Sequence, residues 1–379
     1  MVNIMHVITE LNVGGAEVML AKLLPAMDPD RFSHSVLSLQ NKGPIGSQIE
    51  KLGVPVHELN LHRPFFSIYG LFKLRTILSL ENPDLIQGWM YHGNLVASLF
   101  RSIHLYKRPV IWNIRCSLNN LKQEKFLTQM AILAGSRLSR SATGILYNSH
   151  VSANQHAAIG YFSGKAHIVP NGFDLNRFKP NTHFRHKLRS ALRVPEAGIL
   201  IGLIARYHPM KDHETFLKAA SLMARERENV RFLMLGRGVD NPSSGLEQLI
   251  ASLGLKHRVT CLGEHTDVES FYAALDIASL SSSHGEGFPN VIGEAMACSI
   301  PCVVTDVGDS RRLVGKTGIV VPPKDSMALK KGWDTLINKR QTERANMGRA
   351  ARKRILENFA ISSVAAQYEE HYQQVIDLI

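Results

Sequence analysis

The sequence lacks any apolar run long enough to cross a membrane. A transmembrane helix needs about 20 consecutive apolar residues, and no hydrophobic segment of this chain reaches that length. The N-terminus also lacks the basic lead and cleavage site of a secretory signal, because residues 2–9 have the pattern of a strand. We therefore expect a cytoplasmic protein that attaches to the inner face of the cell membrane at most peripherally.

Cysteine is scarce, and its spacing excludes a zinc site. The four cysteines, Cys116, Cys261, Cys298 and Cys302, stand apart in apolar surroundings. We predict buried free thiols in a reducing compartment. The 17 histidines show no ligand spacing either, so we expect no metal. The chain also lacks a P-loop and a G-x-S-x-G nucleophile motif.

Positive charge is what the sequence has in excess. The formal net charge is +12, and residues 1–170 hold 16 Lys and Arg against 9 Asp and Glu. A basic protein attracts nucleic acid, anionic lipid or anionic small molecules. No basic stripe interleaved with aromatic residues is present, so we expect no nucleic-acid partner.

Short apolar strands alternate with helical patterns along the whole chain, which predicts parallel sheets in an α/β protein. Strand patterns fall at residues 4–9, 35–39, 85–89, 110–114, 144–148 and 168–169, then at 199–205, 231–235, 259–262, 277–280, 302–305 and 318–321. A looser basic segment, 177–192, separates the two series. The length of 379 residues accommodates two doubly wound domains, which we place at residues 1–180 and 181–358.

Two glutamates stand eight positions apart, Glu286 in a predicted loop and Glu294 one to two turns inside the short helical pattern that follows it. A helix N-terminus offers unpaired N–H groups and a partial positive charge, which suit a phosphate. Carboxylates suit the hydroxyls of a sugar. From these residues alone, solvated glutamates on a surface loop are an equal alternative.

Polar and glycine residues follow several predicted strands, at the edge where ligands bind in such sheets. In the second half these are Arg206, Lys211, Gly236 and His265; in the first half they are Gly14, Gly15, His92, Asn113 and Arg115. Arginine can bind two phosphate oxygens at once, and lysine adds a point charge. Gly14 and Gly15 lack the third glycine of the dinucleotide fingerprint, which argues against a nicotinamide enzyme. Solvated cations and a structural histidine are the alternatives.

Taken together, these motifs resemble family four of the retaining glycosyltransferases, which have the GT-B fold. The matching pieces are Gly14-Gly15-Ala16-Glu17, Pro170-Asn171-Gly172-Phe173-Asp174, Arg206 with Lys211, Gly236-Arg237-Gly238, and the run from Glu286 to Ala297. The resemblance covers essentially the whole chain. It implies two Rossmann-like domains facing a cleft, an acceptor-side domain before a donor domain, and a last helix, 359–379, that packs back on the first domain.

The resemblance also implies roles for individual residues. His92 and Glu286 would lie at the reacting sugar, Arg206 and Lys211 at the diphosphate, and Glu294 at the ribose. The remaining donor-side residues would be Gly14, Gly15, Gly236, His265, Phe288, Pro289, Asn290 and Val291, and the acceptor-side residues Asn113 and Arg115. The family often has E-G-F-G-L where this chain has Pro289 and Asn290. Pro289 removes one backbone N–H donor from that loop.

We therefore predict a retaining, metal-independent hexosyltransferase without a cofactor. It would use a nucleotide-sugar donor, preferably a UDP-sugar, and a cell-envelope glycan or lipid-linked acceptor. The alternatives are another GT-B enzyme, such as a sugar-nucleotide epimerase or a phosphorylase, and a non-catalytic module that binds anions.

One stretch raises the separate hypothesis of peripheral contact with an anionic membrane. Residues 121–140 carry an apolar face with basic residues around it, as a helix on a membrane surface does. An ordinary helix whose apolar face packs on the core has the same pattern. The sequence favours this second interpretation.

Overall fold

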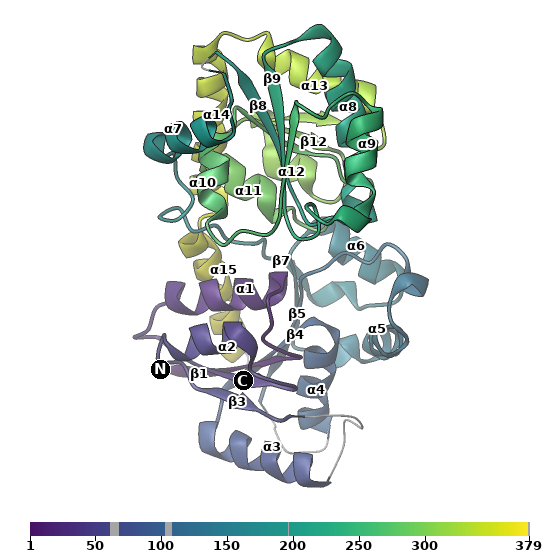
Figure 1. Cartoon of the computed structure of the whole chain (residues 1–379). Helices are drawn as coiled ribbons and strands as arrows, with labels where there is room; N and C mark the ends of the chain where they lie inside the picture. The colour runs from purple at the N-terminus through teal and green to yellow at the C-terminus, as the bar shows by residue number, and fades with distance from the viewer. Residues whose placement is uncertain (61–67, 103–107, 196, 378–379) are drawn as a thin grey trace. The chain divides into compact units, whose positions relative to one another are not determined.

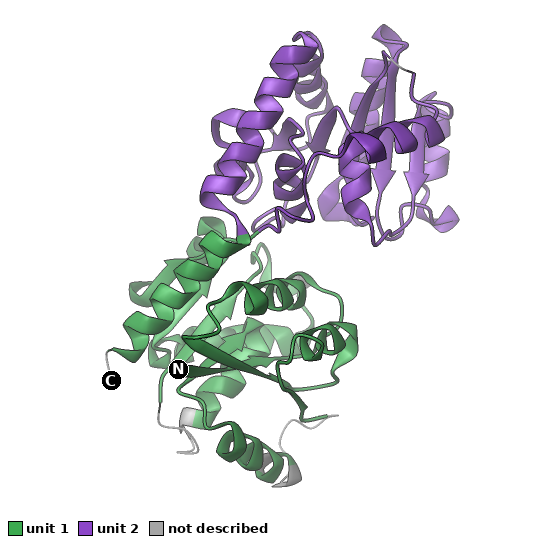
Figure 2. Cartoon of the chain, turned by 90° about the vertical axis from the view of Figure 1, so that its left-hand side faces the viewer, with its two compact units in different colours: residues 1–172, 361–379 green, residues 173–360 purple. Residues whose placement is uncertain are grey.

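A computed structural model describes residues 1–60, 68–102, 108–195 and 197–377, which form two compact units (Figures 1 and 2). Unit 1 comprises Met1–Gly172 and Ile361–Ile379, and unit 2 comprises Phe173–Ala360. The chain therefore changes unit after Gly172 and again after Ala360, whereas the sequence placed these boundaries after residues 180 and 358. The first and last residues of unit 2 are held together. Phe173 pairs with Ala360 in a parallel bridge, and its N–H donates to the Phe359 carbonyl at 2.9 Å.

The described part of unit 1 contains a parallel sheet of seven strands in the order β3-β2-β1-β4-β5-β6-β7. The strands are β1 (Val2–Ile8), β2 (Phe32–Ser38), β3 (Val56–Glu58), β4 (Leu85–Trp89), β5 (Val110–Ile114), β6 (Gly144–Tyr147) and β7 (Ala166–Ile168). This order reverses direction at β1 and β4, as doubly wound sheets do. We did not expect the short edge strand β3 from the sequence.

Helices cover both faces of this sheet. They are α1 (Gly15–Leu23), α2 (Gly43–Glu50), α3 (Ile68–Glu81), α4 (Met90–Ser102), α5 (Phe126–Leu138), α6 (His150–Ala158) and α15 (Ile361–Ile376). One core joins α1, α2 and α15 to the sheet, and a second joins α3, α4 and α5 to the other face. None of the described helices in either unit is both long and apolar enough to cross a bilayer.

The last helix, α15, belongs to unit 1 although all of unit 2 precedes it in sequence (Figure 2). Tyr368 and Tyr372 on this helix are completely buried. The Tyr372 hydroxyl donates to Gln87 on β4, and the Asp28 N–H donates to the Glu369 carboxylate at 2.7 Å. The expected return of the C-terminal helix to the first domain is therefore confirmed.

Unit 2 repeats the architecture with a parallel sheet of six strands, in the order β10-β9-β8-β11-β12-β13 within its described residues. The strands are β8 (Ile199–Ile204), β9 (Val230–Leu235), β10 (Val259–Leu262), β11 (Ile277–Leu280), β12 (Cys302–Thr305) and β13 (Ile319–Val321). The helices are α7 (Thr182–Ala191), α8 (His213–Glu226), α9 (Leu246–Ser252), α10 (Val268–Ala274), α11 (Asn290–Ala297), α12 (Ser310–Val314), α13 (Ser326–Ile337) and α14 (Gln341–Asn358). The prediction of two doubly wound α/β halves is confirmed.

Helix α7 corrects our reading of residues 177–192 as a looser segment. Asn181 caps its N-terminus by accepting from the Phe184 N–H. Arg185 and Arg189, one turn apart, both bind the Asp276 carboxylate, at 2.6 and 2.7 Å. Arg185 also donates to the last carbonyls of α10, including that of Leu275 at 2.9 Å. The basic residues Arg185 and Arg189 therefore bind groups at the C-terminal end of α10. The charge pattern of the sequence alone does not indicate these contacts.

The burial of Tyr372 predicts that α15 stabilises unit 1 strongly. We expect Tyr372→Ala to lower the free energy of unfolding of unit 1 by about 3–5 kcal/mol, because it leaves a cavity under the helix. Gln374→Ala, on the exposed side of α15, should change it by less than about 0.5 kcal/mol. Urea unfolding measures both, and an equal effect of the two variants would contradict this anchoring role.

Candidate active site

The loop between β11 and α11 holds Glu286 against a lysine from another loop. The Lys211 Nζ lies 2.5 Å from Glu286 Oε1, and Ser282 Oγ donates to the same oxygen at 2.5 Å. The side chains of Lys211 and Glu286 are only 13% and 7% exposed. Among the described residues, Glu286 Oε2 accepts no hydrogen bond. The carboxylate is thus held in one orientation with a free acceptor oxygen.

The loop before Glu286 is fixed to the end of β8 by hydrogen bonds. Ser281 Oγ donates to the Lys211 carbonyl at 2.8 Å, and the Ser283 N–H donates to the Met210 carbonyl at 2.9 Å. β11 pairs in parallel with β8, so both loops leave the sheet at the same edge. The pairing of Lys211 with Glu286 therefore follows from strand order.

Glu294 lies half-buried in the second turn of α11. The Tyr272 hydroxyl donates to its Oε2 at 2.9 Å. Burial raises the pKa of Tyr272 well above its usual value, and the Glu294 carboxylate raises it further, so the phenol stays protonated and donates. Tyr272 was not expected from the sequence, because nothing in its neighbourhood indicates that α10 packs beside α11.

The start of α11 is packed on the segments that link the two units. The Phe288 ring stacks on Phe173 with a 6.2 Å centroid separation and lies 5.6 Å from Phe359. Gly293 is required here, since a Cβ at this position would stand 1.9 Å from the Phe173 ring. The side chain of Phe288 therefore serves the core, which leaves only its backbone for the donor contact that we predicted.

Pro289 occupies the N-cap position of α11, which begins at Asn290. A proline suits a helix start but has no N–H to donate. The next backbone N–H groups at this helix end are those of Asn290 and Val291, since the Ile292 N–H already donates to the Pro289 carbonyl at 3.1 Å. The helix also carries a partial positive charge at this end. Whether these residues bind a donor stays a prediction.

Positively charged side chains follow the end of β8. The Arg206 side chain is exposed and, among the described residues, makes no hydrogen bond or ion pair. Burial lowers the pKa of His208, and the nearby charges of Arg206, His284 and Lys211 lower it further. His208 Nδ1 accepts from the Met210 N–H at 3.2 Å, which also requires the neutral ring. The charges of Arg206, His284 and Lys211 thus act together at His208, a residue to which the sequence had assigned no role.

Gly236 is explained by the packing of two strand ends. Its φ is +151°, and a Cβ would stand 2.3 Å from the Ala205 carbonyl oxygen, so only glycine lets β9 approach the end of β8. His265, after β10, is exposed; its Nδ1 lies 3.7 Å from an Asp267 carboxylate oxygen and its ring lies against Phe271. The structure thus groups Arg206, Lys211 and Glu286, while His265 contacts other residues.

In unit 1, Gly15 and His92 follow neighbouring strands, because β1 pairs in parallel with β4. Gly14 is the N-cap of α1, and no atom lies within 4 Å of where a Gly15 Cβ would be. His92 stands in the first turn of α4, where burial lowers its pKa and favours the neutral ring. Burial also raises the pKa of Glu17 in the first turn of α1. The predicted ligand contacts of Gly14, Gly15 and His92 stay predictions.

Asn113 and Arg115 are buried and bind the protein itself. Asn113 Nδ2 and Arg115 Nη1 each donate to the Tyr368 hydroxyl at 2.9 Å. Arg115 also donates to the Val169 carbonyl at 2.9 Å and to the Asn171 side chain. These contacts tie α15 to the turn that ends unit 1. This is a structural role, and the acceptor contact that we predicted for both residues has no support in these bonds.

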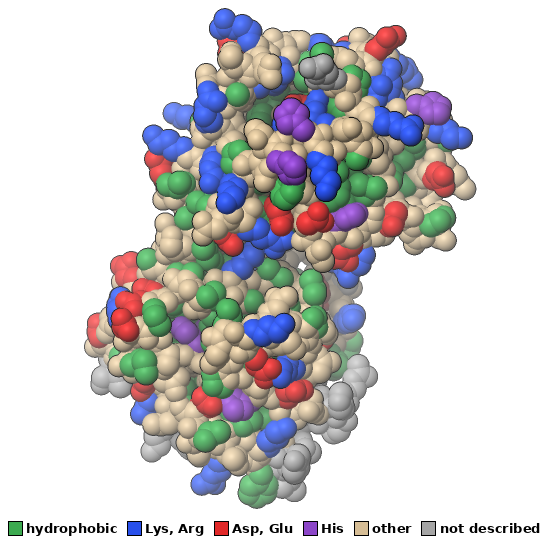
Figure 3. Space-filling model, turned by 60° about the vertical axis from the view of Figure 1, so that its left-hand side comes forward, with side chains coloured by type: hydrophobic (Ala, Val, Ile, Leu, Met, Phe, Trp, Pro, Cys, Tyr) green, Lys and Arg blue, Asp and Glu red, His purple; other side chains and the backbone are tan. Residues whose placement is uncertain are grey.

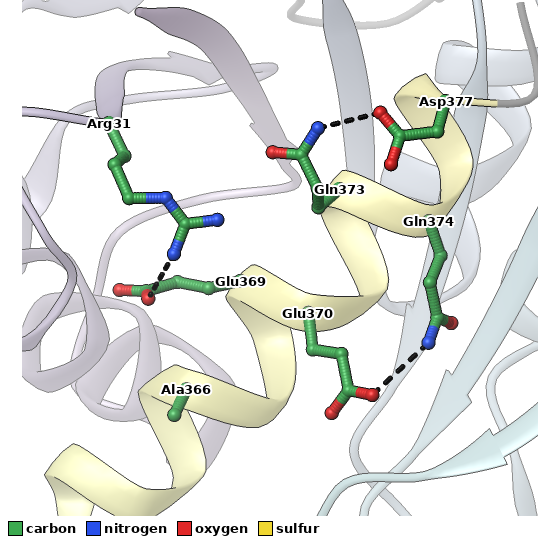
Figure 4. Close-up of a pocket in the computed structure, with 7 residues that line it drawn as sticks. All are labelled: Arg31, Ala366, Glu369, Glu370, Gln373, Gln374 and Asp377. Atoms are coloured by element: carbon green, nitrogen blue, oxygen red, sulfur yellow. Dashed lines mark hydrogen bonds and ion pairs between the residues drawn. The ribbon is translucent and has the colours of Figure 1, made fainter.

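Two surface features do not involve the candidate site residues described above. Figure 3 shows Lys and Arg side chains interspersed with carboxylates over the visible face of both units, without one continuous basic stripe. Figure 4 shows a hollow beside α15 whose polar residues bind one another: Arg31 with Glu369, Gln373 with Asp377, and Gln374 with Glu370. Mutual bonding leaves this hollow without converging groups for a ligand.

Sequence families match both units. The family described as Glycosyltransferase Family 4 matches residues 13–177, and the one described as Glycosyl transferases group 1 matches residues 198–339. The chain is 26% identical to the lipopolysaccharide core biosynthesis mannosyltransferase LpsB of Rhizobium meliloti, over 70% of this chain and 82% of LpsB. It is 34% identical to a D-inositol 3-phosphate glycosyltransferase of Geodermatophilus obscurus, but the alignment spans only 37% of that protein.

Solved structures share the fold over the whole chain. Anabaena Alr3699/HepE in complex with UDP superposes with a TM-score of 0.83 and 23% identity, covering 99% of this chain and 100% of that one. Sucrose-phosphate synthase from Thermosynechococcus elongatus superposes with a TM-score of 0.79 and 17% identity, covering 100% of both chains. These identities are low enough that the likeness concerns architecture alone.

The convergence on His208 predicts a measurable electrostatic response. Because the charge of Arg206 lowers the pKa of His208, Arg206→Gln should raise it, and so should saturating pyrophosphate, which neutralises the same cations. NMR titration of the histidine signals measures the shift. Arg225→Gln, an exposed position on α8, is the control and should leave the pKa unchanged. An unaltered pKa in both the Arg206 variant and the pyrophosphate sample would refute the anion site.

The buried pair of Lys211 and Glu286 predicts strong coupling in stability. Lys211→Met leaves the Glu286 carboxylate buried without its cation, which should cost about 3–5 kcal/mol of the free energy of unfolding of unit 2. The double variant Lys211→Met/Glu286→Gln should recover most of this loss in urea unfolding. Lys218→Met is the matched control, because its ion pair with Glu214 is half-exposed and should contribute less than about 1 kcal/mol. Additive losses in the double variant would mean that the two charges are not coupled.

Proposed function

We propose a specific reaction for this chain, which belongs to the group 1, family 4 glycosyltransferases of the GT-B fold. The reaction transfers a hexose from a nucleotide diphosphate sugar, preferably a UDP-sugar, to a hydroxyl acceptor, with retention of anomeric configuration. The observation that carries the proposal is the Lys211–Glu286 pair at the carboxyl edge of the unit 2 sheet, with Arg206 in the same loop as Lys211.

In this proposal the cations hold the diphosphate. Arg206 is exposed and free to fork two phosphate oxygens, and Lys211 places a second charge close by. The start of α11 adds backbone donors and its partial charge. These groups would stabilise the negative charge that builds on the departing phosphate, the role that a divalent metal has in other transferases. We therefore propose that transfer needs no metal.

The two glutamates bind hydroxyls at opposite ends of the donor. Glu286 offers Oε2 to the transferred sugar, because Lys211 and Ser282 both occupy Oε1. Glu294 binds the ribose hydroxyls, with Tyr272 fixing the carboxylate in place. A carboxylate accepts two or more such bonds, and each is stronger than a bond to a neutral acceptor. HepE, which shares this fold, is solved with UDP-glucose.

Retention follows from attack on the same face as the leaving group. The bond from the anomeric carbon to the phosphate oxygen breaks, and the bond from that carbon to the acceptor oxygen forms. The acceptor's proton passes to the departing phosphate oxygen, so no side chain has to act as base. Glu286 stabilises the oxocarbenium-like carbon by its charge, and neutral His92 hydrogen-bonds a donor hydroxyl.

For the acceptor we propose only a chemical class. LpsB, which aligns over most of both chains, is described as a mannosyltransferase of lipopolysaccharide core biosynthesis. We propose a cell-envelope glycan or a lipid-linked acceptor for this chain as well, and a site of action on the cytoplasmic side. The basic first half of the sequence suits an acceptor that carries phosphate or sits among anionic lipids.

Donor binding by purified protein tests the site. We expect Arg206→Gln and Glu294→Gln each to raise the dissociation constant for the preferred sugar nucleotide by about 10-fold to 100-fold, because each removes one charged hydrogen-bonding partner. Calorimetry over a panel of sugar nucleotides finds the donor and measures the loss. Turnover, followed as nucleotide release, should fall in parallel.

Matched controls separate site effects from general charge effects. Arg225→Gln and Glu247→Gln alter exposed residues on α8 and α9 and should bind the donor as the parent does. Full donor binding by both site variants would refute the residue assignment. Nucleotide release only when an acceptor is present distinguishes the transferase. Conversion of the sugar nucleotide without net nucleotide release would instead favour an epimerase, and turnover of a sugar phosphate without any nucleotide would favour a phosphorylase.

A further inference from the structure

Helix α5 of unit 1 exposes a row of large apolar side chains to solvent. Phe126 is 72% exposed, Met130 52% and Leu133 41%. These three stand at the spacing i, i+4, i+7, so they lie along one face of the helix. Leu127 and Leu138 flank the row and are 44% and 43% exposed. The row of three runs for about 10 Å along the helix axis.

The opposite face of α5 already packs on unit 1. Ala131, Ile132 and Gly135 are buried, and the Tyr161 hydroxyl donates to the Ile132 carbonyl at 3.1 Å. These are the smaller residues of the helix, apart from Ile132. The interpretation that sequence favoured, an apolar face packed on the core, is therefore wrong for the largest apolar residues of α5.

Basic residues mark both ends of the exposed row. Lys122 and Lys125 are exposed before the first turn, and Arg137 and Arg140 are exposed at the last. Residues 126–138 contain no acidic residue, and Glu124 is the only one between 121 and 140. A flat-lying amphipathic helix in a membrane interface has this arrangement, with apolar side chains inserted and cations among the headgroups.

We propose that this exposed face of α5 is a membrane-binding surface that docks unit 1 on a bilayer rich in anionic lipid. Phe126, Met130 and Leu133 insert between the acyl chains near the headgroups. Lys122, Lys125, Arg137 and Arg140 bind the lipid phosphates around them. The surface is remote in sequence from the donor-binding loops of unit 2 and acts independently of the donor.

Charge argues against a second copy of this chain as the occupant. Pairing two α5 helices in either direction sets a basic end of one against a basic end of the other. A folded protein partner would need a groove shaped to take a convex row of side chains. A fluid bilayer accepts protruding side chains without a matching shape, and its anionic headgroups complement both basic ends.

Vesicle co-sedimentation with the full chain tests the proposal. The probe is a vesicle of phosphatidylcholine with an equal part of phosphatidylglycerol, compared with phosphatidylcholine alone, without sugar nucleotide. We expect the parent to prefer the anionic vesicle, and Phe126→Ser/Met130→Ser/Leu133→Ser to bind it at least about tenfold more weakly. Lys122→Gln/Arg137→Gln should lose most of the preference for anionic over neutral vesicles.

The control variant is Met327→Ser/Leu356→Ser, which removes two comparably exposed apolar residues, 48% and 54% exposed, from unit 2. It should bind anionic vesicles as the parent does. Because all substituted residues are exposed, the melting temperature should not change. Equal vesicle binding by the α5 variant and its control, or no binding by the parent, would overturn the proposal. So would a parent dimer in light scattering that the α5 variant abolishes. None of these outcomes depends on sugar transfer, so the donor site is tested separately.

Discussion

The parallel pairing of strands is the constraint on which the rest of this structure depends. In a parallel sheet every strand enters its following loop at the same edge. The loops after β8 and β11 therefore meet, and Lys211 reaches Glu286 although the two are far apart in sequence. The same rule brings the loops after β1 and β4 together in unit 1, with Gly15 and His92.

Burial decides which polar residues serve the fold and which are available to a ligand. Asn113 and Arg115 lie at a strand end, as the glycosyltransferase resemblance requires, yet their donors bind Tyr368 and the turn at Asn171. Arg206 lies at an equivalent position and stays exposed. A polar residue after a strand is thus only a candidate, because the neighbouring helix can take up its hydrogen bonds first.

Much of the fold follows from local pattern. The alternation of apolar strands with helices predicted both doubly wound halves, and the return of the last helix came with the family resemblance. The edge strand β3 and helix α7 were not predicted. Helix α7 contains no fully buried residue, and its Arg185 binds the Leu275 carbonyl at the end of α10 and the Asp276 carboxylate, contacts that a local pattern cannot indicate. The apolar face of α5 was assigned to the core because periodicity cannot tell which side is covered.

The sequence by itself determined the two-domain α/β architecture, the family and the loop and helix that carry Glu286 and Glu294, because these depend on local periodicity and on short motifs. Only the tertiary structure decided that Lys211 neutralises Glu286, that Tyr272 orients Glu294 and that charges converge on His208. It also decided that α5 turns its largest apolar residues outward. Each of these depends on which segments pack together, and that is set by the whole sheet rather than by neighbouring residues.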